Sequence, residues 1–126
     1  MMRLIGRRKQ VEPDEVGPAR SLRELVDHAK ESLADDARWL PTLYLSSGEG
    51  SETYLLPPGD PDTRRIVADL TRRAECFVLV TLDRAADGAE RVHLRAQQGR
   101  KKLEWAAPLD PRDGRTVRPP DWVRLP

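Results

Sequence analysis

The sequence predicts an α+β fold, a two-layer sandwich in which a mainly antiparallel five-stranded sheet carries two helices on one face. Two segments place apolar residues at helical spacing, and five others alternate apolar and polar residues or form a short apolar run. Short turns rich in glycine, aspartate and proline separate the strands and favour hairpins, which are antiparallel. The predicted order is therefore helix, two strands, helix, three strands.

The length of 126 residues predicts one domain, which we place at residues 21–109. Residues 1–20 combine basic side chains with prolines and scattered apolar positions, which indicates a flexible basic tail. Residues 110–126 are predicted to form a proline-rich tail that docks on the domain. A single cysteine excludes an internal disulfide, and no apolar run is long enough to span a membrane. We therefore expect a cytoplasmic protein with no membrane partner.

The first helix begins at Ser21, which forms a capping box with Glu24. Pro41 disfavours helical geometry at the preceding residue, so the helix is expected to end near Arg38 or Trp39. Its apolar residues recur at helical spacing and predict one buried stripe, formed by Leu22, Leu25, Val26, Ala29, Leu33 and Leu40.

A hairpin is predicted next, because alternating residues 42–46 and 51–56 flank a turn that contains two glycines. The second helix is expected to begin at Asp60 and Pro61, as an N-cap aspartate followed by proline at the first helical position. It presents a narrow apolar stripe from Ile66 to Ala74. Both helices are thus amphipathic and need a sheet face to cover.

Residues 76–82 form the only continuous apolar run and are predicted to be an interior strand at the centre of the core. Residues 90–97 and 102–107 alternate and complete the three-stranded part of the sheet. In these two strands one face holds Val92, Leu94, Leu103 and Trp105. That face is expected to contact the helices.

The sequence contains no pattern that indicates catalysis, a cofactor or a metal ion. Cys76, His28 and His93 each stand alone, without the paired spacing of metal ligands. No nucleophile elbow occurs, and the glycine-rich turn at residues 48–50 lacks the lysine and the following helix of a phosphate-binding loop. We therefore predict no enzyme activity, no catalytic residue, no cofactor and no metal site.

The polar face of the last strands is the main candidate for binding. Its basic residues are expected to lie together on the open side of the sheet, with an aromatic residue of the first hairpin beside them. Two tryptophans at element ends could anchor a partner. The partner-binding candidates are Trp39, Tyr44, Arg91, His93, Arg95, Lys102 and Trp122.

Two functions fit these candidates. The first is a small non-enzymatic module that binds another protein or a second copy of itself, as an accessory or regulatory subunit of a larger assembly. The alternative is a nucleic-acid-binding domain, in which the basic face and the N-terminal tail contact phosphates and Tyr44 stacks on a base. The net charge of +1 does not separate them, because the acidic middle and basic ends of the chain nearly cancel.

Overall fold

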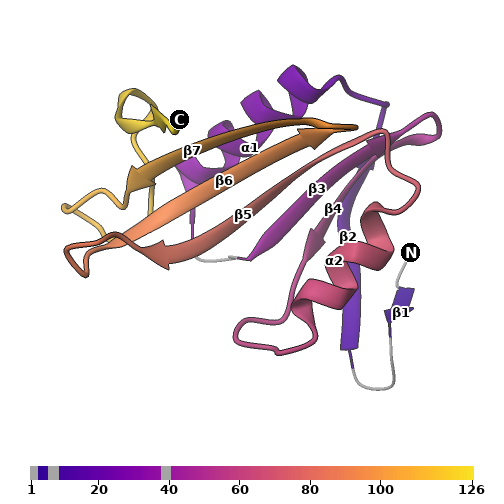
Figure 1. The fold of residues 1–126 in the computed structure, drawn as a ribbon, viewed down its shortest axis with the longest axis horizontal. Coiled ribbons are helices and arrows are strands. Elements are labelled where there is room, and N and C mark those ends of the chain that lie inside the picture. Colours follow the sequence, from indigo (N-terminus) through magenta and orange to yellow (C-terminus); the bar gives the residue numbers. More distant parts are fainter. Residues whose placement is uncertain (1–2, 6–8, 38–40) are drawn as a thin grey trace.

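The computed structural model describes residues 3–5, 9–37 and 41–126, and it is an α+β fold built on an open antiparallel sheet (Figure 1). Two helices and six long strands form the body, and two short strands extend the sheet at its ends, in the order β1-β2-β4-β3-β5-β6-β7-β8. The elements are β1 (Arg3–Ile5), β2 (Lys9–Gly17), α1 (Leu22–Asp35), β3 (Thr42–Ser47), β4 (Gly50–Leu55), α2 (Thr63–Thr71), β5 (Cys76–Arg84), β6 (Glu90–Gln98), β7 (Lys101–Pro108), the 3₁₀ turn η1 (Pro119–Asp121) and β8 (Val123–Arg124). The predicted α+β class and antiparallel sheet are confirmed, but the sheet has more than the five strands predicted.

The sixth long strand is β2, which lies in the segment predicted to be a flexible tail. β2 pairs antiparallel with β4, Gly17 lying opposite Ser51. An unpaired β4 edge would leave its backbone N–H and C=O groups without partners in the sheet, and β2 supplies them. The pairing shifts register between Pro13 and Val16, as expected for a strand that contains proline at a sheet edge. The structure thus adds a strand, between β1 and β4, that the irregular, charged sequence of this segment did not indicate.

Helix α1 forms as the sequence predicts at its start. The Ser21 hydroxyl accepts the Glu24 N–H at 3.2 Å, and the Glu24 carboxylate accepts the Ser21 N–H at 3.2 Å. These hydrogen bonds lower the pKa of Glu24. The helix ends at Asp35, earlier than expected, and Trp39 lies outside the described residues. Its buried stripe consists of Leu22, Leu25, Val26, Ala29 and Leu33.

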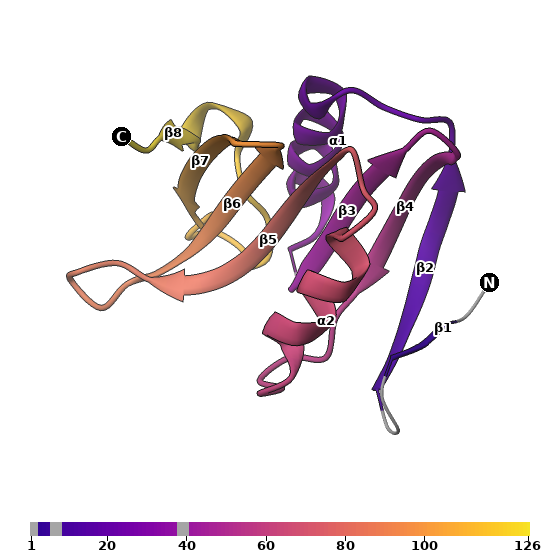
Figure 2. The same cartoon turned by 45° about the vertical axis from the view of Figure 1, so that its right-hand side comes forward.

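The two helices lie on opposite faces of the sheet, whereas both were predicted on one face (Figure 2). The β5 strand explains the difference. Val78 and Val80 pack into the cluster beneath α1, while Phe77 and Leu79 pack against the cluster beneath α2. A strand that is apolar on both sides needs cover on both sides. The architecture is therefore α1, sheet, α2, not a two-layer sandwich.

The C-terminal segment packs on the α1 side of the sheet. Val117 is fully buried in the α1 cluster, and its N–H donates to the Leu33 carbonyl at 2.9 Å. Further along, η1 contacts α1 and the Trp122 side chain packs against the same cluster. The Lys30 ammonium lies 4.5 Å from the Trp105 ring centroid and 5.7 Å from that of Trp122. This cation–π contact links helix, sheet and C-terminal segment.

Acidification below about pH 4 should weaken the C-terminal segment through Asp110 and Asp113. Hydrogen bonds from Arg112 lower the pKa of Asp110, and those from Arg115 and Thr116 lower the pKa of Asp113. Since both folded-state values lie below the unfolded ones, their stabilisation is complete above the unfolded pKa and is lost as pH falls through the folded pKa. Melting temperature measured by tryptophan fluorescence from pH 7 to 2.5 should show this loss. Asp113→Asn should flatten the acid limb, and an unchanged acid limb in that variant would contradict the prediction.

Candidate binding groove between α2 and the sheet

A groove of about 510 Å³ runs between α2 and strands β5 and β6. It exists because α2 covers β3, β4 and part of β5, and leaves the polar face of β6 open beside it. α2 begins at Thr63, slightly later than predicted, since Asp60 accepts the Asp62 N–H at 2.7 Å and holds the preceding residues in a turn. The groove is lined by Thr63, Arg64, Val67, Ala68, Thr71, Phe77, Leu79, Arg95 and Gln97.

The floor of the groove is apolar and only partly covered. Phe77 and Leu79 are half-buried, and each packs on one side against the α2 cluster. Val67 forms the buried edge of the helix wall, while Ala68 is exposed on it. Contiguous apolar surface left partly open on a small protein is characteristic of a binding site.

The rim of the groove carries positive charge. Arg64 rises from α2 and Arg95 from β6, and the described residues that line the groove include no carboxylate. The Arg95 guanidinium lies 6.0 Å from the Phe77 ring centroid, within the range of a cation–π contact. Its Nε is buried and has no hydrogen-bond partner in the described part of the chain. The groove is therefore lined by a guanidinium beside an apolar floor, and one donor of that guanidinium is buried without a partner in the described structure.

The predicted basic face is only partly brought together. Pairing in register puts Arg91, His93, Arg95 and Lys102 on the same side of β6 and β7. However, Arg91 Nε lies 2.8 Å from an Asp83 carboxylate oxygen, and His93 Nε2 lies 3.3 Å from a Glu104 oxygen. Arg95 lines the groove and Lys102 is exposed on β7. Of these four residues, Arg91 and His93 are occupied by neighbouring carboxylates.

The aromatic candidates lie elsewhere. Tyr44 is buried on the α1 side of the sheet, where its ring meets His28 edge to face with centroids 5.5 Å apart. It pairs in register with Val78 and so faces away from Arg95. Trp122 packs on the α1 side with the C-terminal segment, and Trp39 falls outside the described residues. Neither Tyr44 nor Trp122 lies at the groove.

Sequence reasoning missed the helix wall of the groove. Arg64, Val67, Ala68 and Thr71 were not singled out, because α2 was expected on the other face of the sheet. The signal was present in the run at residues 76–82. This run has apolar residues at both odd-numbered and even-numbered positions, so both faces of the strand need cover.

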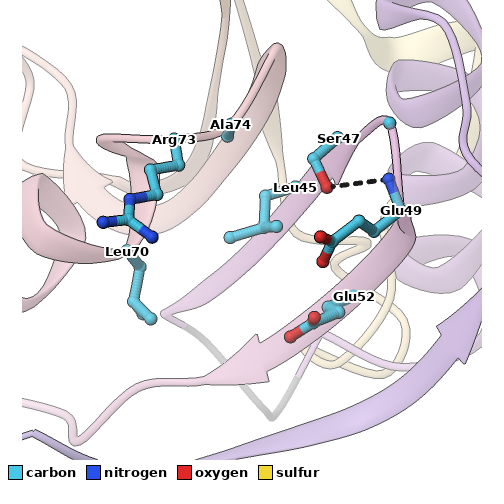
Figure 3. A pocket seen from close by; sticks show the side chains of 8 residues that line it. Leu45, Ser47, Glu49, Glu52, Leu70, Arg73 and Ala74 are labelled. Carbon is cyan, nitrogen blue, oxygen red and sulfur yellow. Dashed lines mark hydrogen bonds between the residues drawn. The ribbon is translucent and has the colours of Figure 1, made fainter.

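A second hollow, of about 410 Å³, lies at the other side of α2 (Figure 3). Glu49 and Glu52 extend from the β3–β4 hairpin toward the space that Leu70 and Arg73 face from the end of the helix. The Glu52 carboxylate accepts the Tyr54 hydroxyl, and Ser47 accepts the Glu49 N–H at 3.4 Å. This hollow is mixed in charge, and the Glu52 carboxylate already accepts a hydrogen bond. The groove beside β6 is therefore the stronger candidate.

The described residues show no cluster of side chains that could bind a metal ion. Within residues 3–5, 9–37 and 41–126 no three His, Cys, Asp or Glu side chains gather in a way that could hold a metal ion. Cys76 is buried, and desolvation raises the pKa of its thiol, which disfavours the thiolate a nucleophile needs. In the same part of the chain no helix is both long and apolar enough to cross a membrane.

Comparison with protein-family models, with curated proteins and with solved structures finds no significant match for this chain. The class of protein is therefore argued from the fold and the groove alone. The chain is a small α+β domain with an open antiparallel sheet, one helix on each face of that sheet, and a groove with an apolar floor beside the second helix.

Proposed function

We propose that the protein is a small non-enzymatic protein-binding module, an accessory or regulatory subunit of a larger assembly in the cytoplasm. The observation that supports this proposal is the groove between α2 and β6, with its half-buried Phe77 and Leu79 and its cationic rim. Partly open apolar side chains ringed by polar groups are the composition of a small protein interface. A cytoplasmic location agrees with the single buried cysteine.

Nucleic-acid binding is the second candidate, because four basic residues share the α2 side of β6 and β7. Two features weigh against it. The Arg91 charge is offset by Asp83, His93 already contacts Glu104, and Tyr44 faces the other side of the sheet. A phosphate backbone would gain few unpaired cations here, and Tyr44, the ring predicted to stack on a base, is buried on the opposite face. The protein-binding proposal therefore has the better support.

Substitution at Ala68 should separate the two candidates. Ala68→Glu adds bulk and negative charge to the exposed wall of the groove without removing a core side chain, so it should reduce recovery of a specific partner at least tenfold. Affinity copurification from cells that naturally produce the protein, quantified by mass spectrometry, measures this. Ala86→Glu, the same change in the exposed β5–β6 turn, is the matched control and should retain the partner.

Equal recovery with both variants, or recovery of the lone chain, would contradict groove binding. Retardation of a labelled single-stranded RNA at low salt, lost on charge reversal at Arg91, Arg95 and Lys102, would favour the nucleic-acid candidate.

A further inference from the structure

We infer that the occupant of the groove is a segment of a partner protein that carries a carboxylate next to an apolar side chain. This inference rests on the proposed protein-binding function and names the chemistry that the site selects. It is carried by three features of the groove, which are its unsatisfied arginine donor, the sign of its charge and the position of its apolar floor.

The first feature is the state of Arg95. Its Nε is buried without a hydrogen-bond partner in the described structure. A buried donor that lacks a partner is unfavourable, and more so when the group is charged. The Arg95 Cζ atom lies 6.0 Å from the centroid of the Phe77 ring. A guanidinium that packs on a ring keeps its in-plane N–H groups available as donors. Because Nε itself is buried, a carboxylate in the groove would meet the terminal N–H groups of the guanidinium, which pair well with carboxylates.

The second feature is the sign of the charge. Arg64 and Arg95 face the groove from opposite walls, and the described lining holds no acid that would neutralise them. Two neighbouring arginines differ in this respect, since Arg65 on α2 lies 3.7 Å from Asp62 and Arg72, just after the helix, lies 2.9 Å from Asp69. Within the described residues neither Arg64 nor Arg95 makes an ion pair, although Glu104 lies opposite Arg95 in the β6–β7 register, where it contacts His93. An acidic ligand is attracted to the groove, and a basic one is repelled.

The third feature is the apolar floor. Phe77, Leu79 and Val67 lie beside the two arginines, so a side chain next to the ligand carboxylate would contact them. Burial of that side chain supplies affinity, while the arginines select for charge. A free carboxylic acid of small size would satisfy Arg95 but leave this floor exposed. The combination therefore fits a peptide segment with an acidic residue adjacent to an aliphatic or aromatic one.

Selection of random 12-residue peptides on the immobilised full chain tests the inference. Enriched peptides should contain aspartate or glutamate next to an apolar residue. The most enriched peptide and its amide analogue, with each acid replaced by Asn or Gln, would then be titrated by fluorescence polarisation. Arg95→Gln should weaken the acidic peptide about tenfold or more and barely change the amide analogue. Arg95→Lys should restore the binding only in part, because it keeps the charge and loses the fork.

Arg65→Gln is the matched control, an exposed arginine of α2 that lies outside the groove, and should change affinity less than about twofold. Enrichment of peptides without excess acid would overturn the inference, as would equal losses for the acidic peptide and its amide analogue in Arg95→Gln. If such non-acidic peptides still lose binding in Ala68→Glu, the groove function stands and only the acidic specificity fails. If no selected peptide loses binding in Ala68→Glu, both the groove function and its acidic specificity would be contradicted.

Discussion

Leu94→Ala should lower the free energy of unfolding by about 2 to 5 kcal/mol, the cost of truncating a fully buried leucine. Leu94 has 0% exposure and sits on β6, between β5 and β7 and beneath α1. Its loss opens a cavity among Val78, Val80 and Val92, all of which are fully buried in strands that hydrogen bonds hold in place. The surroundings can therefore collapse only partly into the vacated space.

Leu79→Ala is the control for this prediction. It removes the same atoms from the neighbouring strand, but Leu79 is half-buried at the groove and part of its side chain already contacts solvent. Its loss should cost less than half as much, since less area returns to water. Urea denaturation followed by circular dichroism gives both values. Equal costs would show that the two faces of the sheet contribute equally and that the α1 side does not hold the main core.

The elements that sequence reasoning predicted are those with local signals. The capping box of Ser21 and Glu24 marks the start of α1, because the reciprocal hydrogen bonds involve residues three positions apart. Alternation between Val92 and Ala96 likewise places β6, because successive side chains of a strand point to opposite faces. Each of these patterns is decided within a few residues of the chain.

What the sequence did not predict depends on distant partners. β2 carries Pro13 and charged residues, and it becomes a strand through backbone pairing with β4, which no local pattern encodes. The face chosen by α2 depends on which side of the sheet remains uncovered after α1 has packed. Phe77 illustrates this, because the run that contains it was expected to be central, yet the side chain faces the groove.

The candidate site divides in the same way. Arg95 was identified from alternation along its own strand, and it lines the groove. Arg64 could not be assigned to the groove from the sequence, because its place there depends on which face of the sheet α2 covers. Tyr44 was assigned to the basic face, but the register of β3 against β5 turns it to the α1 side. Alternation fixes relative side-chain direction within a strand, and the register between strands fixes it across the sheet.

Gly50→Ala should destabilise the protein by about 2 to 5 kcal/mol, from positive-φ strain and overpacking together. Gly50 has a φ of +139°, and an added Cβ would lie 2.6 Å from the carbonyl oxygen of Gly17. That oxygen belongs to β2, whose pairing with β4 starts at this point, with Gly17 opposite Ser51. The backbone of β2 must move away to make room, which disrupts the edge of the sheet.

Gly99→Ala isolates the contribution of that contact. Gly99 also has a positive φ, +59°, but nothing lies within 4 Å of a Cβ built there. It should therefore cost only about 1 kcal/mol, the strain of a left-handed alanine alone. Hydrogen exchange adds a spatial readout, because Gly50→Ala should raise exchange along β2 and the facing edge of β4, whereas Gly99→Ala should affect the β6–β7 turn. If both variants lost the same stability and β2 kept its protection, the pairing of residues 9–17 with β4 would not be the contact that requires glycine at position 50.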